Sequence, residues 1–283
     1  MVIIVHWHAP DWCESAVKSI LKSEGVDVHV TVINNGGELS LPSAVTVVDA
    51  GRNRGFAGGA NLGLEAWLAG SVEHCFVASH DLLVAPDTFR CLLDVAARSP
   101  GFGILGPWFT PRVARVGQIV ELDELVEFQW LSGSGLLITR ECAEKTGFFD
   151  EDFGSYVEDE EYCLRARDRG FRVGAVPSAN ASNLGTRHSD RAFIMMRGNE
   201  ILLSAKQGRW RKVCSQLAIE LVLASRSASS AFSRKNSRRA ALRQAYLHGR
   251  AAAFGIRQLS KYVVRSKPAA PATASREHPR ASA

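Results

Sequence analysis

The sequence predicts an α/β protein built on a mostly parallel, doubly wound sheet with helices on its faces. Short runs rich in Val and Ile alternate with helix-patterned segments through the first half of the chain, and this alternation is typical of parallel strands joined by helices. The chain has 283 residues, of which 46% are hydrophobic, which suits one large domain or one domain with an appendage. No uninterrupted apolar run approaches the roughly 20 residues that cross a bilayer.

The elements of the first half follow one another in a regular order. MVIIV predicts a strand, not a signal peptide, which would open with basic residues and continue with a longer apolar region. The next segment predicts a helix with Asp11 as its N-cap. Then come the strands VDVHVTVIN and VTVVD, the glycine-rich helix GFAGGANLGLEAWLAG, the strand HCFVASHD and the helix PDTFRCLLDVAARSPG, which Pro residues bound at both ends.

The second half is less regular. A Gly-Ser-Gly segment precedes an expected strand, and a helix is expected from about Tyr156 to Arg169. Residues 190–262 have a helical pattern. We divide the chain into a domain over 1–205, a basic helical region over 206–264 and a disordered tail over 265–283, whose composition leaves little to bury.

Charge is divided unevenly between these regions. Residues 206–283 hold 17 of the 34 Lys and Arg residues but two of the 29 acidic residues, a net charge of +15, whereas residues 1–205 carry −10. A basic region of this kind suits an anionic membrane surface or an acidic partner, or it is a solvated helical pair packed on the domain. Nucleic acid is disfavoured as a partner because stacking aromatics are not interleaved with the basic residues.

The six cysteines are scattered along the chain without paired spacing. This pattern argues against a disulfide framework and a zinc site, and it favours reduced thiols in a cytoplasmic protein.

Polar clusters follow three of the expected strands, at residues 6–8, 34–37 and 79–81. The carboxyl ends of strands in such sheets are where ligands bind. The triplet Ser79-His80-Asp81 is not a hydrolase triad, because contiguous residues of a strand point to alternate faces and cannot form the required hydrogen-bonded line. Asp81 is either a ligand for a divalent cation or a turn residue, and we expect His80 to be structural.

The segment DAGRNRGFAGGANLGLEA places several glycines at a strand-to-helix junction. Glycines there let backbone approach a phosphate at a helix N-terminus, or they satisfy a tight loop. The segment is neither a Walker loop nor G-x-G-x-x-G, which makes an NAD-dependent oxidoreductase a remote alternative.

An acidic cluster, Glu158 to Glu161, opens the helix expected after Tyr156. Acids in a first turn are favoured by the helix dipole, and Glu161 can pair with Arg165 four residues on. A carboxylate in an aromatic, acidic cleft can also act as a general base toward an acceptor hydroxyl.

Five segments, taken in order, resemble motifs of the family 2 glycosyltransferases, in particular the rhamnosyl- and galactofuranosyltransferase-like members. They are INNGG at 33–37, NRGFAGGANLG at 53–63, SHD at 79–81, WLSGSGLLITRE at 130–141 and GFFDEDFGSYVEDEEYCLRARDRGFRV at 147–173. The second and the fifth are specific, and the set covers about residues 1–205. The resemblance implies a GT-A fold, with a Rossmann-like sheet for a nucleotide sugar and a second half that supplies the acceptor site.

The resemblance also implies roles for individual residues. Asp159, beside Glu158, would deprotonate the acceptor, and Asp81 would hold a divalent cation, Mn or Mg, on the donor diphosphate. The donor would contact residues from five segments: His6, Trp7, Asn34, Asn53, Gly55, Phe56, Ala57, Asn61, Ser79, Asp81, Ser132 and Gly133.

Three positions depart from the family pattern. Ser79 replaces the first acid of the D-x-D motif, Asn34 replaces the base-reading Asp, and Asn183 stands where a second metal ligand is often His, with His188 a few residues later. The metal site is therefore weakened, and either the donor supplies most of its ligands or cationic side chains stabilise the leaving group.

The sequence thus predicts a cytoplasmic, inverting glycosyltransferase that uses a UDP- or dTDP-sugar and a glycan, lipid-linked or small-molecule acceptor. The basic region would place it peripherally on the inner membrane face. The alternative is a non-catalytic or metal-independent sugar-nucleotide-binding protein on the same scaffold.

Overall fold

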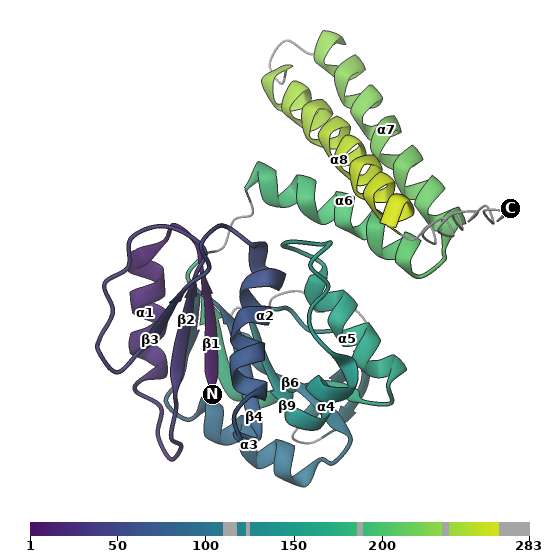
Figure 1. Cartoon of the computed structure of the whole chain (residues 1–283). Coiled ribbons are helices and arrows are strands. Elements are labelled where there is room, and N and C mark those ends of the chain that lie inside the picture. Colours follow the sequence, from purple (N-terminus) through teal and green to yellow (C-terminus); the bar gives the residue numbers. More distant parts are fainter. Residues whose placement is uncertain (110–117, 123–124, 186–188, 234–237, 266–283) are drawn as a thin grey trace, which may run out of the picture.

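The computed structural model describes residues 1–109, 118–122, 125–185, 189–233 and 238–265 (Figure 1). Within these residues, ten strands form one sheet with the order β3-β2-β1-β4-β9-β6-β10-β8-β7, and β5 pairs with β10. The strands are β1 Val2–His6, β2 Val30–Asn34, β3 Thr46–Asp49, β4 His74–Ser79, β5 Leu82–Val84, β6 Phe102–Phe109, β7 Gln118–Leu122, β8 Leu125–Phe128, β9 Gly135–Thr139 and β10 Arg172–Asn183.

The predicted mostly parallel sheet is confirmed. Strands β3, β2, β1 and β4 pair in parallel, as do β6 and β10. Strand β9 runs antiparallel between β4 and β6, which restores the direction of β4 in β6. Because β9 is reversed, the residues that enter it lie at the same edge of the sheet as the residues that leave β4.

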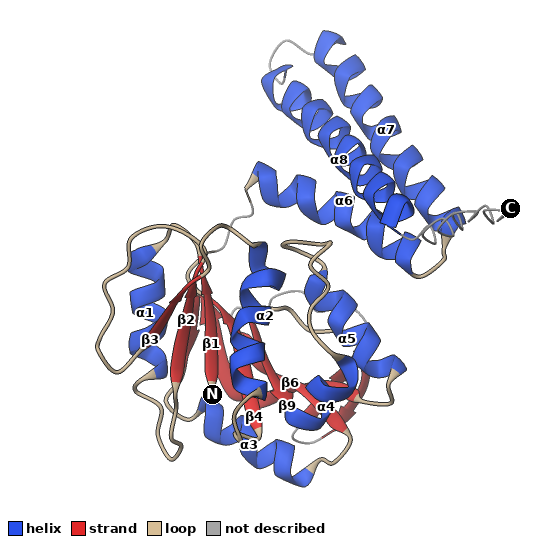
Figure 2. Ribbon diagram, viewed as in Figure 1, coloured by secondary structure: helices blue, strands red, loops and turns tan. Residues whose placement is uncertain are grey.

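Helices cover both faces of the sheet (Figure 2). The helices of this part are α1 Pro10–Ile20, α2 Gly55–Leu68, α3 Thr88–Arg98, α4 Arg140–Thr146 and α5 Glu158–Asp168. Alternate residues of β1 serve the two layers: Ile3 and Val5 pack with α2, α4 and α5, whereas Val2 and Ile4 pack with α1 and α3.

Four of the six cysteines are buried within these two layers. Cys75, Cys142 and Cys163 belong to the layer on the α2 side, and Cys13 belongs to the layer on the α1 side. All six are free thiols, as the sequence predicted, and burial raises the pKa of Cys13 to about 12.

The first helix begins differently from the prediction. Asp11 lies in the first turn of α1, while Ala9 occupies the N-cap position without a side-chain hydrogen bond. The correction follows from Pro10, which is favoured in the first turn because its missing N–H would be unpaired there.

Helix α2 is packed closely on the sheet through its glycines. A Cβ on Gly63 would lie 2.6 Å from the side chain of Ile3, and one on Gly59 would lie 2.8 Å from Val5. A Cβ on Gly55, whose φ is +73°, would lie 2.3 Å from the carbonyl oxygen of Gly154. Close packing of α2 on β1 accounts for Gly59 and Gly63, and the sequence did not suggest it.

Three further helices follow the sheet: α6 Asp190–Lys206, α7 Trp210–Ser233 and α8 Arg238–Arg265. Helices α7 and α8 lie side by side and α6 packs on α8 (Figure 1), so the helical pattern predicted for 190–262 is confirmed. Helix α6 runs across the boundary proposed at residue 205. The predicted disordered tail lies outside the described residues, apart from Arg265, which ends α8. Among the described helices, none is long and apolar enough to cross a membrane.

Candidate active site

The carboxyl ends of β1, β2 and β4 bring three predicted site residues to one edge of the sheet. The register pairs His6 with Asn34 and Val5 with Ser79. The polar clusters that the sequence places after these strands therefore converge, as expected from the parallel topology.

His6 and Asn34 are bound to each other. His6 is buried, and its Nδ1 lies 2.9 Å from Asn34 Oδ1, while the backbone N–H of Ala9 donates to His6 Nε2 at 3.1 Å. Since Nε2 accepts, Nδ1 carries the proton. Burial lowers the pKa of His6, which favours this neutral form. Asn34 Oδ1 also accepts from Gly36 N, and its contact with a nucleobase stays a prediction.

A cleft of about 470 Å³ opens beside this pair, between the end of β1 and the start of α1. Its walls include Trp7, Trp12 and His80, and the Trp12 and His80 rings are stacked with centroids 6.1 Å apart. Both indoles are about two-fifths exposed. We expected His80 to be structural, and the structure places it in the cleft wall. The sequence analysis did not predict Trp12 as a site residue, although an exposed Trp at the start of an amphipathic helix can indicate a binding surface.

Ser79 and Asp81 form the next part of the edge. The Ser79 hydroxyl donates to Asp81 Oδ1 at 2.5 Å. Strand β4 ends at Ser79, and Asp81 lies in the turn that follows it. A Cβ on Gly185 would lie 3.0 Å from Asp81 Oδ2 and 3.3 Å from the Trp12 ring. The carboxylate therefore lies next to the aromatic cleft.

Residues 132–134, which lead into β9, connect Asp81 with the acidic cluster of α5. Ser79 N donates to Ser134 O at 3.3 Å, and Gly133 N donates to Asp159 Oδ2 at 2.6 Å. A Cβ on Gly133 would lie 3.1 Å from Asp159 Cβ. The predicted residues Ser132, Gly133 and Asp159 are thus brought together, and a side chain at position 133 would be in tight contact with Asp159.

The carboxyl groups of Glu158 and Asp159, at the start of α5, both have raised pKa values. Glu158 is buried, and its Oε2 has no hydrogen-bond partner among the described residues. Burial, followed by the charge of Asp159, raises the pKa of Glu158 well above its usual range. Burial also raises the pKa of Asp159, although the N–H groups of Gly133 and Glu160 partly stabilise its charge. Such a pair suits proton transfer.

The architecture has solved counterparts. The mannosyltransferase PcManGT from Pyrobaculum calidifontis, in complex with GDP-Man and Mn2+, matches with a TM-score of 0.59 and 18% identity, over 90% of this chain and 86% of that one. GalNAc-T7, with UDP, GalNAc and Mn2+, matches with a TM-score of 0.57 and 13% identity, over 72% and 47%. The chain has the GT-A fold. No family model matches the sequence.

Two of the sequence relatives are also named as glycosyltransferases. An N-acetylglucosaminyl-diphospho-decaprenol L-rhamnosyltransferase of Mycobacterium tuberculosis is 29% identical over an alignment of 185 residues, and the match covers 53% of this chain and 57% of that protein. The hexosyltransferase Agl10 of low-salt glycan biosynthesis in Haloferax volcanii is 23% identical over 198 residues, 61% and 63% of the two chains. An uncharacterised protein of M. tuberculosis is 26% identical over 190 residues, 63% and 71%. The chain resembles family 2 glycosyltransferases in sequence and in fold.

The GT-A neighbours carry Mn2+, and the residues here fit a divalent cation that takes most of its ligands from a donor. Asp81 offers a carboxylate. Asn183, which pairs in register with Leu82, has a buried Oδ1 without a hydrogen-bond partner among the described residues, while its Nδ2 donates to Ser134 Oγ at 3.0 Å. Both are hard oxygen ligands, and phosphate oxygens commonly complete such a site. The described residues hold no group of three His, Cys, Asp or Glu side chains suited to a metal, and His188 lies outside them.

The donor contacts expected of the glycine-rich segment stay a prediction, while the structure shows which protein groups its residues bind. Phe56 N donates to Ser155 Oγ and Ala57 N to Gly154 O, both at 2.9 Å, so these amides at the start of α2 are occupied by protein groups. The side-chain amide of buried Asn61 donates to the carbonyl oxygen of Phe149 and accepts from the N–H of Phe149. These predicted donor contacts join two parts of the fold. Asn53, which is exposed, accepts from Gly55 N at 2.8 Å.

Two residues that the sequence did not single out also lie at the candidate site. The Arg191 guanidinium, from α6, lies 5.5 Å from the Trp7 ring. Burial, and then the charges of Glu158 and Asp81, raise the pKa of Tyr156, while the charge of Arg191 lowers it. Tyr156 therefore lies within electrostatic reach of both halves of the site. Arg191 is separated from β1 by most of the domain sequence, so only the fold reveals its position.

Proposed function

We propose that this chain is an inverting glycosyltransferase that moves a sugar from a UDP- or dTDP-sugar to an acceptor hydroxyl. The observation that carries the proposal is the position of Asp159: a carboxylate with a raised pKa, fixed by Gly133 N–H, on a segment that also contacts the Asp81 side of the sheet edge. A general base and a charged donor site at one edge suit a direct displacement.

In this proposal, Asp159 accepts the proton of the acceptor hydroxyl. The hydroxyl oxygen forms a bond to the anomeric carbon while the bond from that carbon to the diphosphate oxygen breaks, and the diphosphate leaves with the electron pair. In-line displacement inverts the anomeric centre. Burial, and then the charge of Asp159, raise the pKa of Glu158 well above its usual range, which favours the neutral form of Glu158 beside the base.

The donor would lie along the edge from the aromatic cleft to Asp81. The cleft between Trp7, Trp12 and His80 has the size and the apolar walls of a site for a flat base. A divalent cation held by Asp81 and Asn183 would neutralise charge on the departing diphosphate. Arg191 lies near the cleft and would supply a fixed positive charge to the same group.

The acceptor would be lipid-linked, with the α7–α8 hairpin on the anionic inner face of the membrane and the domain in the cytoplasm. The named rhamnosyltransferase relative supports this acceptor class. In the hairpin, Leu221, Val222 and Ile256 are more than half exposed. The one acidic residue of 206–265 is Glu220, which is buried against Arg197 and His248. A surface of apolar and basic side chains without acids suits anionic lipid.

The alternative, a sugar-nucleotide-binding protein without transfer activity, is favoured by Ser79 and Asn183, which replace two family carboxylate or imidazole positions. One experiment separates the two. Binding of UDP, dTDP and GDP is measured by calorimetry with and without Mn²⁺, and the corresponding donor sugars are then followed for release of the nucleoside diphosphate.

Metal-dependent binding of UDP or dTDP together with release of diphosphate supports the transferase. Binding without release, in the presence of candidate acceptors, supports the binding protein. If none of the nucleotides binds in either condition, the proposed donor site is wrong.

A further inference from the structure

The loop over residues 150–157, which leads into the proposed catalytic carboxylates, contains a strained turn. Tyr156 and Val157 have φ values of +70° and +76°. Residues other than glycine pay about 1–3 kcal/mol each for such conformations, and a β-branched residue is especially unsuited to them. Val157 is the N-cap of α5, and Glu158 and Asp159 follow it directly. Whatever holds this turn therefore sets the position of both carboxylates.

A buried amide of α6 holds the turn through its backbone. Asn199 is fully buried, and its Nδ2 donates to the carbonyl oxygens of Phe153 at 2.9 Å, Ser155 at 3.0 Å and Tyr156 at 2.8 Å. Carbonyl oxygens accept only, so the nitrogen of the amide must face the loop. Three carbonyl groups of the loop therefore accept from one side chain.

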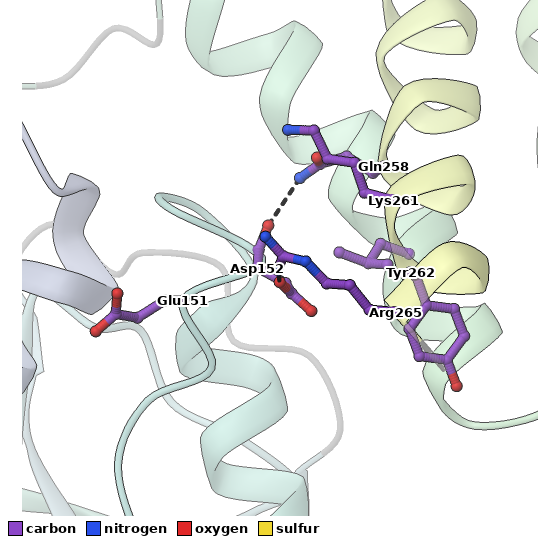
Figure 3. A pocket seen from close by; sticks show the side chains of 7 residues that line it. Glu151, Asp152, Gln258, Lys261, Tyr262 and Arg265 are labelled. Atoms are coloured by element: carbon purple, nitrogen blue, oxygen red, sulfur yellow. Dashed lines mark hydrogen bonds and ion pairs between the residues drawn. The ribbon is translucent and has the colours of Figure 1, made fainter. Parts of the chain in front are cut away.

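A second amide, from α8, fixes the first. Gln258 is buried, and its Nε2 donates to the carbonyl oxygen of Asp152 at 2.8 Å and to Asn199 Oδ1 at 3.2 Å. Figure 3 shows the bond from Gln258 to Asp152, with Arg265 on the same side of the loop. The Asn199 side chain thus accepts from α8 and donates to the loop.

Ion pairs surround these two amides. Lys206 Nζ lies 2.6 Å from Asp150 and 2.8 Å from Asp152, and Arg265 also pairs with Asp152. The loop is therefore joined to α6 and α8 by neutral and charged contacts at once. On its other side it is joined to the start of α2 through Gly154 and Ser155.

We propose that Gln258 and Asn199 are positioning residues for Glu158 and Asp159, so that the C-terminal helices form part of the catalytic unit. The inference rests on the proposed function for its catalytic consequence, and on the contacts above for its structural part. Gln258 acts through Asn199, and Asn199 acts through the carbonyl groups of the turn. Neither amide touches the reacting atoms.

The test is Gln258→Met in the full chain. Met preserves the length of the side chain but donates no hydrogen bond, which leaves Asp152 O and Asn199 Oδ1 unpaired. We expect kcat to fall about tenfold, since small displacements of a catalytic group have effects of this order or larger. The affinity for the nucleotide should stay within twofold, because the donor cleft lies at another part of the site. The acid limb of the pH–rate profile should shift, since the surroundings of Asp159 change.

Gln244→Met is the matched control. It makes the same chemical change on the same helix at an exposed side chain, and we expect wild-type values of kcat, nucleotide affinity and melting temperature. If Gln258→Met matches this control in kcat and in the pH profile, the positioning role is wrong.

A measurement that does not depend on activity separates the two proposals. Hydrogen–deuterium exchange should become faster at the amides of residues 153–159 in Gln258→Met and not in Gln244→Met, whether or not the chain transfers sugar. Unchanged exchange overturns the positioning role even if the transferase is active. Faster exchange in a chain that binds no nucleotide supports the structural part and overturns the proposed function.

Discussion

At the scale of single residues, the site depends on side chains that bind one another before any ligand arrives. His6 and Asn34 are paired, Ser79 is bound to Asp81, and Asp159 is bound to the backbone of Gly133. Each polar group is held in one orientation, which is a requirement for a site that acts through fixed dipoles and charges.

Asp159→Asn tests the general base directly. The neutral amide cannot take the acceptor proton, and its oxygen can still accept from Gly133 N. We expect kcat to fall by about 10²–10⁴, with nucleotide affinity nearly unchanged. Asp168→Asn, at the exposed end of the same helix, is the control and should keep wild-type activity. Turnover of Asp159→Asn near that of the control would remove Asp159 as the base.

The pH dependence of transfer follows from the same residue. Asp159 must be ionised to act as a base, and burial raises its pKa above the ordinary value for Asp. Activity should therefore be complete at higher pH and be lost as the pH falls through this raised value, above the ordinary pKa of about 3.9. Measurement of kcat/KM from pH 4 to 9 checks this. A flat profile down to pH 4 would contradict it.

Glu160 gives a prediction about stability. Burial, then the charges of Asp159 and Glu200, raise its pKa to about 7. Between pH 4.5 and 7 the folded chain holds this proton and the unfolded chain has lost it, so stability falls as the pH rises through that window. Glu160→Gln should be more stable than wild type by about 1–2 kcal/mol at pH 8 and nearly equal to it at pH 5. Urea unfolding at the two pH values decides. An equal difference at both would reject the shift.

The sequence could locate Asp81, Asp159 and Gly133 because short motifs place them at strand and helix ends. It could not locate Asn199, Gln258 or Arg191 as parts of the site. These residues lie on long helices without a local pattern, and they reach the site only because α6 and α8 return to the 150–157 loop. Contacts between distant segments of this kind leave little trace in composition or spacing.

At the scale of elements, the glycines of α2 show how closely this helix packs on its neighbours. Its sequence left open a phosphate-binding turn or a tight loop, and the structure adds that a Cβ on Gly55, Gly59 or Gly63 would meet β1 or the 150–157 loop. The order of strands and helices was predictable because the hydrophobic residues of each segment in the first half have the spacing typical of a strand or of a helix. Strands β6, β7 and β8 were not singled out, since their sequences do not alternate clearly and are paired by long-range contacts.

Gly63→Ala tests close packing of α2. The new Cβ would lie 2.6 Å from Ile3, a fully buried residue of β1, and overpacking of this kind costs about 1–3 kcal/mol. The control is Gly249→Ala in α8, which has nothing within 4 Å and should be stabilising by up to about 1 kcal/mol through helix propensity. Thermal melting of both variants measures the difference. Equal stabilisation by the two changes would show that there is space for a Cβ atom between α2 and β1.

At the scale of the whole molecule, the C-terminal region and the domain have net charges of opposite sign, and they meet at the 150–157 loop. The domain is acidic and the C-terminal region is basic, while Lys206 and Arg265 join them at Asp150 and Asp152. Deletion of the hairpin would therefore remove the proposed membrane surface and also the contacts that Gln258 and Arg265 make with the loop. Charge substitution is the cleaner experiment.

Four exposed arginines of α8 carry the membrane prediction. Their joint replacement by Gln should weaken binding to vesicles of anionic lipid at least tenfold, since each basic residue near such a surface contributes about 1 kcal/mol. The positions are Arg238, Arg239, Arg250 and Arg257. Vesicle co-sedimentation at two salt concentrations measures the effect, which should shrink as salt rises.

The matched control removes the same charge from exposed positions of the domain. It replaces Lys18, Lys22, Arg90 and Lys145 by Gln. We expect vesicle binding close to that of wild type. If both variants lose binding equally, total charge and not the hairpin surface is responsible, and if neither loses it, the membrane role is wrong.

The placement of the cysteines has a practical consequence for the order in which the protein comes apart. Cys13 reports on one layer and Cys75, Cys142 and Cys163 on the other, while Cys214 is exposed in α7. A thiol reagent will therefore modify Cys214 at once and the buried thiols only when their own layer opens. Peptide mapping of the modified cysteines over time would tell, without any engineered residue, which face of the sheet loses its helices first.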